Sequence, residues 1–471
     1  MDDILRFSIN TCSDFGADYA EARYVESDES GVNFENNKLN NSFVGSSVSL
    51  FIRFKLNNSM SSVFINDNFS KSNITSKIKK QIQLLKSINR INKKSLELAE
   101  PEVNKKKYVV KQKNKINFSD IESYVSKIKP IISKVNDSRI INSTYSLSTK
   151  KIHKKYINTD GSEITSTVPH VDMFYFLTVK GKNKSAQRMN FFNGVGGWEL
   201  FDKWKVAKTI KDESETMIKN IDIAKKVKPG VYDYVIGSEV AGIMVHESVG
   251  HPYEADRILG RESAQAGESF IKKDMIGQRA GSDYVTINDD PTIDNVAGYY
   301  LYDEEGLKSR NRTLIKNGII NEFYHDRQSA MHFGLKSNAS ARIDNNSNEP
   351  LIRMANTFVK PGKSTEASLI KDVKKGIYMK NFMEWNIDDK RYNFKAKGNE
   401  AYLIENGEIT DPLLFPNLEV DTIKLWTSVD GVGNKSSFGL TSAICGKGQP
   451  MQGAPVSMGG PSLLLRGINH R

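Results

Sequence analysis

Apolar positions along the first 90 residues change from helical spacing to alternation and back to helical spacing. The first helical pattern runs to about Cys12, and Asp2 or Asp3 can cap it. Alternation then predicts an antiparallel meander of four strands, at residues 17–26, 31–34, 46–54 and 61–65. Apolar residues return at helical spacing from Ile74 to Ile88. We therefore expect an N-terminal α+β domain at residues 1–90.

Residues 91–226 repeat this scheme after a connection rich in Lys and Asn. Few apolar positions occur at residues 91–117, which predicts a surface connection. A helix is expected at residues 121–134, interrupted at Pro130, and a long helix at residues 202–226 closes the unit. Between them, with Asp160-Gly161 as a type I′ turn, alternation predicts strands at residues 140–147, 151–157, 163–167, 173–180 and 186–192. These features indicate a middle α+β domain with a basic linker.

Residues 227–471 begin with one strand and one helix and continue mainly as short strands. The apolar run at residues 231–236 predicts the strand, and Gly237-Ser238 begins the helix. Hairpins are expected at Asn317-Gly318 and Asn406-Gly407. The expected later elements are strands at 284–288, 298–302, 311–316, 319–324 and 401–405, and helices at 326–333 and 368–375. The chain is therefore predicted to be a multi-domain α+β protein with antiparallel or mixed sheets and helices, not a doubly wound sheet.

Composition is typical of a globular protein without a membrane segment. The 471 residues are 38% hydrophobic and 9% aromatic, which suffices for two or three domains with sizeable cores. The N-terminus lacks the basic and apolar regions of a signal peptide, and no run of about 18 apolar residues occurs. We expect a cytoplasmic protein. Its two cysteines, Cys12 and Cys445, are too few for a disulfide framework and are expected to be free thiols.

The net charge of +11 originates in one segment. Between Lys71 and Lys155 there are 22 Lys and Arg against 6 Asp and Glu, whereas the rest of the chain holds 45 and 50. A basic segment can bind nucleic acid, but no RNA- or DNA-binding signature accompanies it. We favour a solvated helix face with a lysine-rich linker and do not expect nucleic acid as a partner.

His246, Glu247 and His251 place two imidazoles and a carboxylate within six residues on the first helix of the C-terminal part. The His-Glu-x-x-x-His spacing is one residue longer than the His-Glu-x-x-His of common zinc peptidases. Histidines five apart diverge by about 140° around a regular α-helix, whereas histidines four apart differ by about 40°. A π-bulge would return both to one face. Gly250 tolerates such a distortion, and Pro252 ends the helix just after it.

A catalytic zinc site commonly has three protein ligands and an open position for water. His246 and His251 supply two ligands. Cys445 is the leading candidate for the third, because it is a free thiol in a polar, Gly-rich loop. Glu254 and Glu268, downstream of the histidines, are the alternatives, since a carboxylate is the third ligand in other peptidases.

Glu247 is then expected to act as the general base, taking a proton from a metal-activated water as it attacks a peptide carbonyl. Lys447, close to Cys445 in the sequence, would favour the thiolate. The spacing of the histidines also arises by chance, so a structural or fortuitous set is the competing interpretation.

The other candidate residues have simpler interpretations. His325 and His332 are seven apart on an expected helix and are interpreted as packing or surface residues, although His325 could stabilise an oxyanion. Cys12, on the apolar side of the first helix, is expected to be a small core residue.

Five stretches in order along the chain resemble the motifs of one known family. They are His246 to His251, Val285 to Thr292, Tyr302 to Gly306, Arg353 to Thr357 and Ile444 to Gly448. Together they are similar to the TldD/PmbA family of metallopeptidases, also known as modulators of DNA gyrase. The resemblance runs over nearly the whole chain and is strongest from Val231 onward. It implies a zinc peptidase of three parts, with domains at 1–90, 91–226 and 227–471 and the metal in the last.

The resemblance also implies the roles of the site residues. His246, His251 and Cys445 would be the zinc ligands and Glu247 the catalytic base. Family members with the histidine motif pair with a paralogue that lacks it, around an enclosed cleft that admits short or unfolded peptides. This chain keeps the motif and so resembles TldD. A homodimer or a heterodimer with a paralogue is expected.

Three functions follow from these residues. The first is a zinc-dependent peptidase that hydrolyses short or unfolded peptides. The second is a non-catalytic modulator or binding protein with a structural metal, associated with nucleic acid through its basic segment. The third is a metal-dependent hydrolase of another amide.

Overall fold

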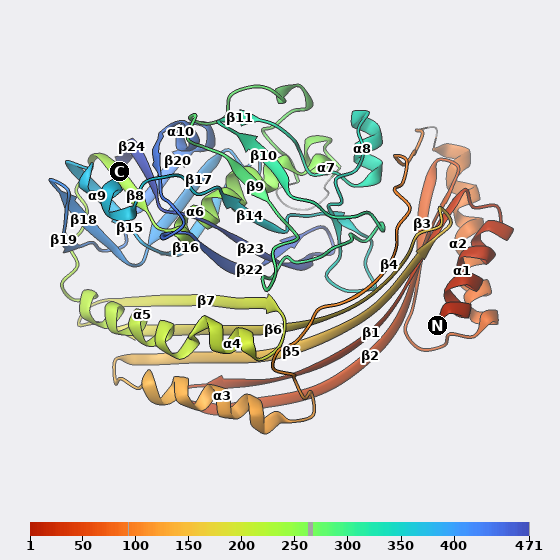
Figure 1. Cartoon of the computed structure of the whole chain (residues 1–471), viewed down its shortest axis with the longest axis horizontal. Helices are drawn as coiled ribbons and strands as arrows, with labels where there is room; N and C mark the ends of the chain where they lie inside the picture. The colour runs from red at the N-terminus through yellow and green to blue at the C-terminus, as the bar shows by residue number, and fades with distance from the viewer. Residues whose placement is uncertain (93, 262–266, 471) are drawn as a thin grey trace.

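A long, curved sheet runs beneath the C-terminal half of the molecule (Figure 1). The computed structural model describes residues 1–92, 94–261 and 267–470. In the curved sheet, β3, β2, β1, β5 and β6 are neighbours in that order, and both β4 and β7 pair with β6. The bounds are β1 (Tyr19–Glu35), β2 (Lys38–Leu56), β3 (Ser59–Ile65), β4 (Lys105–Val109), β5 (Ile140–Asn158), β6 (Glu163–Lys180) and β7 (Ser185–Val195).

The strands of this sheet are longer than the pattern of alternation predicted. The strands expected at residues 17–26 and 31–34 are joined in the single strand β1, and β5 and β6 each join two expected strands. Ser27 to Ser30, which lie between two of the expected strands, pair in unbroken register with β5. Since β1 pairs directly with β5, strands from both sides of residue 90 share one sheet. The domain limits at 90 and 226 stay a prediction.

The basic connection and one turn also differ from expectation. Residues 105–109, expected to be an irregular surface connection, form the exposed strand β4, parallel to β6. Lysines are common on edge strands because their charge opposes further strand pairing. At the β5–β6 turn only Gly161 has a positive φ, of 102°, so the turn is not type I′.

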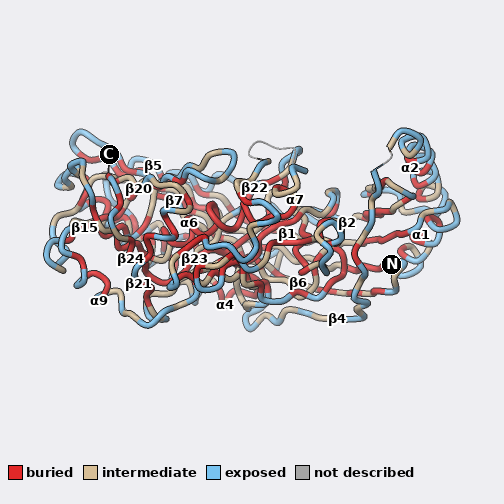
Figure 2. Tube along the Cα trace, turned by 90° about the horizontal axis from the view of Figure 1, so that it is seen from above, coloured by how far each residue is buried: buried red, intermediate tan, exposed pale blue. Residues whose placement is uncertain are grey.

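Helices cover the sheet on one face and at one end. α1 (Asp2–Asp14) and α2 (Lys71–Ile91) pack their apolar sides on β1 to β3 at the N-terminal end, where their outer faces are exposed (Figure 2). α3 (Ile121–Lys134), α4 (Glu199–Trp204) and α5 (Val206–Asn220) cover the face turned away from the C-terminal half. Pro130 lies inside α3 without ending it. The long helix expected at 202–226 is wrong, because Lys205 adopts a left-handed φ of 51° between two helices and the second ends at Asn220.

The C-terminal half consists mainly of short strands in two six-stranded sheets and a three-stranded one. The first sheet has the order β19-β18-β15-β8-β24-β21, the second β11-β10-β9-β14-β23-β22 and the third β16-β17-β20, while β12 pairs with β13. The strands are β8 (Gly230–Ile236), β9 (Ile287–Asp289), β10 (Arg312–Lys316), β11 (Ile319–Ile320), β12 (Ala341–Arg342), β13 (Leu351–Ile352), β14 (Asn356–Val359), β15 (Lys375–Met379), β16 (Phe382–Ile387), β17 (Asn393–Gly398), β18 (Ala401–Glu405), β19 (Glu408–Pro412), β20 (Asn417–Asp421), β21 (Val429–Val432), β22 (Gly439–Lys447), β23 (Gln452–Gly460) and β24 (Leu463–His470).

The helical segments of this half are short. They are α6 (Ser238–Val245), η1 (His246–Gly250), η2 (His251–Tyr253), α7 (Ala255–Ile258), η3 (Lys273–Met275), α8 (Arg327–Phe333), α9 (Glu366–Lys371) and α10 (Thr422–Thr427). Both predicted Asn-Gly hairpins are present, at β10–β11 and β18–β19, whereas residues 298–302 form no strand. Within the described residues, no helix has the length and apolar character that crossing a membrane requires. The α+β fold class is confirmed.

Candidate metal centre

The two histidines of the motif lie on a helix that changes its pitch between them. Strand β8 leads into α6, which continues as the π-helix η1 from His246 to Gly250. The backbone N–H of His251 donates to the carbonyl of His246, which is the i to i+5 bond of a π turn. The departure from a regular α-helix predicted from the spacing is therefore confirmed. Pro252 lies in the 3-10 turn η2, which ends the helix at Tyr253, as expected.

The π turn needs a glycine at position 250, because the neighbouring residues leave no space for a side chain there. A Cβ atom at this position would lie 1.9 Å from the Met354 Sδ. Met354 itself is buried and belongs to the stretch Arg353 to Thr357. The close approach of the π turn to this stretch therefore requires glycine.

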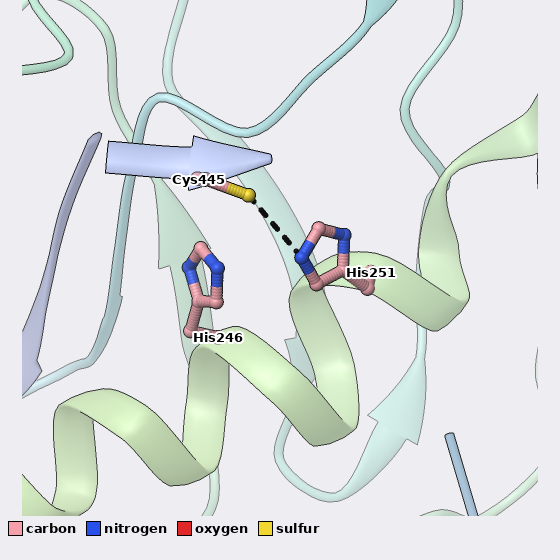
Figure 3. A group of neighbouring side chains, drawn as sticks. All are labelled: His246, His251 and Cys445. Carbon is pink, nitrogen blue, oxygen red and sulfur yellow. Dashed lines mark hydrogen bonds between the residues drawn. The ribbon is translucent and has the colours of Figure 1, made fainter. Parts of the chain in front are cut away.

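Cys445 comes to the histidines from strand β22. Its Sγ lies 3.3 Å from the His251 Nε2 (Figure 3), and one ligand atom from each of His246, His251 and Cys445 lies within 4.8 Å of the others. The three residues are 4%, 3% and 6% exposed. The loop expected around Cys445 is wrong, because residues 439–447 pair with β23 and the chain turns only after Lys447. The three candidate ligands are nevertheless brought together.

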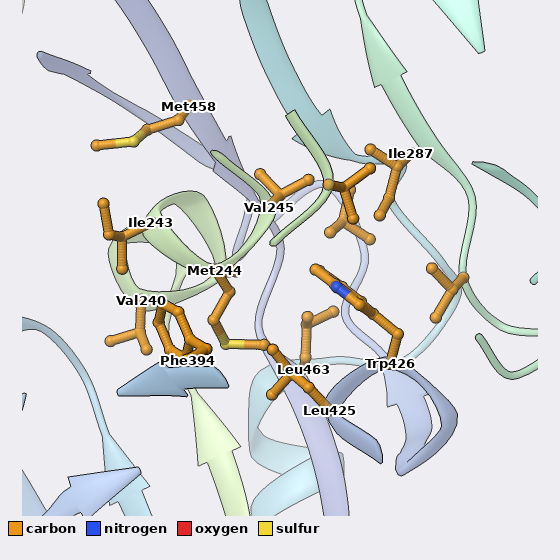
Figure 4. Packing of buried hydrophobic residues seen from close by; sticks show 14 of the residues in the cluster. Val240, Ile243, Met244, Val245, Ile287, Phe394, Leu425, Trp426, Met458 and Leu463 are labelled. Atoms are coloured by element: carbon orange, nitrogen blue, oxygen red, sulfur yellow. The ribbon is translucent and has the colours of Figure 1, made fainter. Parts of the chain in front are cut away.

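An apolar core surrounds the helix that carries the histidines. Val240, Ile243 and Met244 of α6 pack among side chains from both large sheets and from α10, including Trp426 and Leu463 (Figure 4). The Trp426 indole Nε1 donates to the Ser248 Oγ at 2.8 Å, which fixes the π turn against α10. Such packing holds the site rigidly and excludes bulk water.

Neighbouring basic side chains favour the thiolate form of Cys445. Burial acts to raise the pKa of the thiol, but His251, His246 and Arg353 outweigh burial and hold the pKa well below its usual value. Burial acts to lower the pKa of His246, but Cys445 and the nearby Glu247 and Glu254 outweigh burial. The pKa of His246 is therefore raised. Arg353 also donates to the carbonyl of Cys445. The sequence placed Arg353 in one of the five family-like stretches but did not indicate this contact.

Lys447 pairs with two carboxylates near the site. Its Nζ lies 3.2 Å from the Glu254 Oε2 and 2.7 Å from the Asp256 Oδ2. Arg353 is a basic side chain that lowers the pKa of the Cys445 thiol, and an effect of Lys447 on that thiol stays a prediction.

The alternative ligands lie outside the group of three. The Glu254 Oε2 lies 3.1 Å from the His251 Nδ1, behind the ring, and 2.8 Å from the Arg257 Nε. Burial acts to raise the pKa of Glu254, but Lys447 and His251 hold it well below its usual value. Glu268 is exposed and lies 3.8 Å from Lys390. Glu254 is therefore placed to orient His251 as carboxylates behind metal-binding histidines do.

The donor set fits a zinc ion. Two imidazoles and one thiolate are ligands that zinc accepts, and three protein ligands leave one position open. The His246 Nδ1 is buried without a hydrogen-bond partner among the described residues, which is costly unless a further group binds that ring. These observations support a metal site formed by His246, His251 and Cys445.

Glu247 lies beside this group and is only 6% exposed. The Trp385 Nε1 donates to its Oε1 at 2.9 Å, and the Arg391 Nη1 donates to its Oε2 at 2.5 Å. Both partners come from the β16–β17 hairpin, about 140 residues along the chain. No local sequence pattern indicated them.

The remaining histidine and cysteine candidates lie elsewhere. His325 is buried against Phe333, with its Nδ1 3.2 Å from the Ser329 Oγ, and burial lowers its pKa to about 4. His332 is exposed. Cys12 is fully buried in the core beneath α1 and α2, as predicted.

Comparison with known proteins finds relatives of this chain among metallopeptidases. Residues 229–471 match the model of the PmbA/TldA metallopeptidase C-terminal domain. A metalloprotease of Methanocaldococcus jannaschii is 30% identical over 400 residues, which cover 82% of this chain and 85% of that protein. A protein of Saccharolobus solfataricus named zinc metalloprotease TldD homolog is 26% identical over 349 residues, covering 73% and 75% of the two chains.

Solved structures share the fold over the whole chain. A putative modulator of a DNA gyrase from Thermotoga maritima superposes with a TM-score of 0.77 at 15% identity, covering 100% of both chains. TldE from Thermococcus kodakarensis superposes with a TM-score of 0.74 at 17% identity, covering 100% of this chain and 99% of that one. On the sequence matches and the shared fold, the chain belongs to the TldD/PmbA family of metallopeptidases.

Proposed function

We propose that this chain is a zinc-dependent peptidase of the TldD type that hydrolyses short or unfolded peptides. The observation that carries the proposal is the convergence of His246, His251 and Cys445, with ligand atoms within 4.8 Å of one another, beside Glu247. The names of the relatives support a metallopeptidase in general. The ligand set, the base and the peptide substrate are our assignments.

A zinc ion held by the three ligands would supply a Lewis acid and a water of lowered pKa. Glu247 would take the proton of the attacking water at one carboxylate oxygen and pass it to the leaving amine. Glu254 would keep the His251 ring in place through its Nδ1. The low exposure of all these side chains would strengthen their electrostatic interactions with the substrate.

We further propose that the chain acts as a dimer, with itself or with a paralogue. TldE of Thermococcus kodakarensis shares the fold of this chain. Two chains of one fold, one with the histidine motif and one without it, would form a natural pair. Co-purification with a paralogue, compared with the mass of the chain alone, would separate the two forms.

The experiment that tests the proposed function is hydrolysis of an unfolded peptide by zinc-loaded wild type and Glu247→Ala. We expect cleavage by wild type only, with zinc retained in the variant, because Glu247 is not among the ligands. Loss of a general base commonly costs about 10²–10⁴-fold in rate. Cleavage at the wild-type rate by Glu247→Ala would contradict the assignment of the base.

A further inference from the structure

The hairpin β16–β17 contributes two donors to the carboxylate of Glu247, one to each oxygen. The two donors are not equivalent. The Trp385 indole has a single N–H, and Glu247 uses it. Arg391 has five N–H bonds on three nitrogens, and the only one of these nitrogens that contacts Glu247 is Nη1. Arg391 therefore has donors to spare beside the candidate base.

The backbone of Arg391 is fixed from two sides. Its φ of 65° is left-handed, a conformation that is uncommon for residues with a side chain and that collects at functional sites. Its N–H donates to the Asp388 carbonyl at 2.9 Å, and its own carbonyl accepts from the Thr422 Oγ1 at 3.0 Å. Because α10 begins at Thr422, the arginine is tied to the C-terminal core as well as to its hairpin.

One donor of Arg391 is buried without use. The side chain is 13% exposed, and its Nε has no hydrogen-bond partner among the described residues. A buried N–H without an acceptor costs roughly 1–3 kcal/mol. A fixed, strained residue that leaves such a donor next to a candidate base points to an oxygen acceptor supplied by a ligand.

We propose that Arg391 is a second catalytic residue, whose Nε donates to the carbonyl oxygen of the peptide bond that is cleaved. This inference rests on the proposed function. A water oxygen forms a bond to the carbonyl carbon, the C=O π electrons move to the carbonyl oxygen, and Glu247 takes the proton from the water. The carbonyl then re-forms as the C–N bond breaks, and the proton passes from Glu247 to the amine. The Arg391 guanidinium stabilises the negative oxygen, while Nη1 holds Glu247.

Trp385 provides the matched comparison. Trp385→Phe removes one hydrogen bond to Glu247 and no other donor, whereas Arg391→Ala removes the hold on Glu247 and the donor to the substrate. Loss of one donor to an oxyanion costs about 10²–10³-fold in kcat. Lys395, exposed on β17 of the same hairpin and 3.4 Å from Glu419, serves as a control away from Glu247.

The test uses the zinc-loaded full chain and measures turnover of an unfolded peptide beside the affinity for a phosphinic peptide. The phosphinic group carries its negative oxygens where the tetrahedral intermediate would, so its affinity reports oxyanion contacts without catalysis. We expect Arg391→Ala to lower kcat by about 10²–10³-fold, with a similar loss of phosphinic affinity and an unchanged KM. Guanidinium ion added to Arg391→Ala should restore part of the turnover. Trp385→Phe should lose clearly less of both, and Lys395→Ala should match wild type.

Equal phosphinic affinity in wild type and Arg391→Ala would overturn the inference and reduce Arg391 to a residue that positions Glu247. The inference would fail in the same way if Arg391→Ala lost no more turnover than Trp385→Phe. A wild-type chain that holds zinc but neither cleaves peptides nor binds the phosphinic peptide would instead reject the proposed function, and this inference with it.

Discussion

Glu254 shows how a residue can be found from the sequence while its role is not. As a carboxylate close to the histidines it was an alternative zinc ligand, yet its Oε2 lies 3.1 Å from the His251 Nδ1, on the side of the ring away from Nε2 and Cys445. Which side of the ring a carboxylate reaches depends on the backbone between the two residues. That backbone is the 3-10 turn η2, which the sequence did not reveal.

We predict that Glu254→Gln weakens zinc binding by about 10–100-fold, because His251 loses the charged partner that orients it. A competition titration with a chelator of known affinity measures this. Glu268→Gln, which changes the exposed alternative ligand, should bind zinc as wild type does. An unchanged zinc affinity in Glu254→Gln would show that this carboxylate does not support the site.

Another carboxylate, Asp172, faces a cavity of about 340 Å³ between the curved sheet and the C-terminal half. Burial raises its pKa to about 7, from an ordinary value of 3.8. Because the folded state binds the proton more tightly than the unfolded state, Asp172 supports stability below about pH 4, and that support is lost as the pH rises to 7.

We predict that Asp172→Asn gains stability relative to wild type as the pH rises from 4 to 8, by on the order of 1–2 kcal/mol, since the side chain is partly exposed to the cavity. Urea unfolding of both proteins at several pH values measures the difference. A difference that stays constant over this range would mean that Asp172 titrates as an exposed carboxyl does.

The π turn η1 is the element that the sequence predicted best. Two histidines five positions apart have few ways to face one metal, so their spacing predicted a local departure from the α-helix. The β16–β17 hairpin gave no such signal. Its contacts with Glu247 join residues about 140 positions apart, and hydrophobic patterning does not record the partner of a polar side chain.

We predict that Gly250→Ala destabilises the fold by about 1–3 kcal/mol, because the new methyl group would overlap the Met354 sulfur. Thermal unfolding measures the loss, and zinc affinity should fall with it. Gly45→Ala, where a Cβ meets nothing within 4 Å, is the neutral control. The double variant Gly250→Ala/Met354→Ala should lose less than the sum of the single losses. Strict additivity would indicate that the two positions do not compete for space.

Buried ion pairs join the curved sheet to the C-terminal half. Arg188 of β7 lies 2.8 Å from Glu213 of α5 and 2.7 Å from Glu239 of α6, the helix that leads to the histidines. Within the stretch Tyr302 to Gly306, Glu304 contacts Arg23 of β1 and Glu305 contacts Arg53 of β2. This stretch supported the family resemblance, and its acidic residues hold the two halves together.

We predict that Arg188→Met costs about 3–5 kcal/mol of stability, since Glu213 and Glu239, only 16% and 15% exposed, would lose their buried cation. Arg310→Met, which removes an exposed partner of Glu322, should cost at most about 1 kcal/mol. Chemical unfolding of the three proteins compares them. Equal small losses in both variants would mean that the pairs of Arg188 contribute no more than surface pairs.

The sequence predicted individual local elements well, but it predicted poorly where strands continue and which distant segments come together. Residues 121–134 and 401–405 form the predicted helix and strand with the same limits. The predicted strands of the curved sheet were too short, because polar residues inside a strand resemble a turn when their pairing partners are unknown. Cys445, 194 residues from His251, was placed at the site by chemistry and family resemblance, since spacing alone could not reach so far.

The basic segment does not form a free cationic surface along β5. Lys150 pairs with Glu29, Lys151 with Asp28, Lys154 with Glu304 and Lys155 with Glu163. These acidic partners on neighbouring strands and in the C-terminal half explain why an excess of lysine in one segment need not create a nucleic-acid site.

The zinc content of the purified chain, wild type beside Cys445→Ala, tests the metal centre most directly. With three ligands from His246, His251 and Cys445, we predict one zinc per wild-type chain and loss of most of it in Cys445→Ala, while Cys12→Ala keeps its zinc. Unchanged zinc content in Cys445→Ala would remove the thiol from the site and contradict the centre described here.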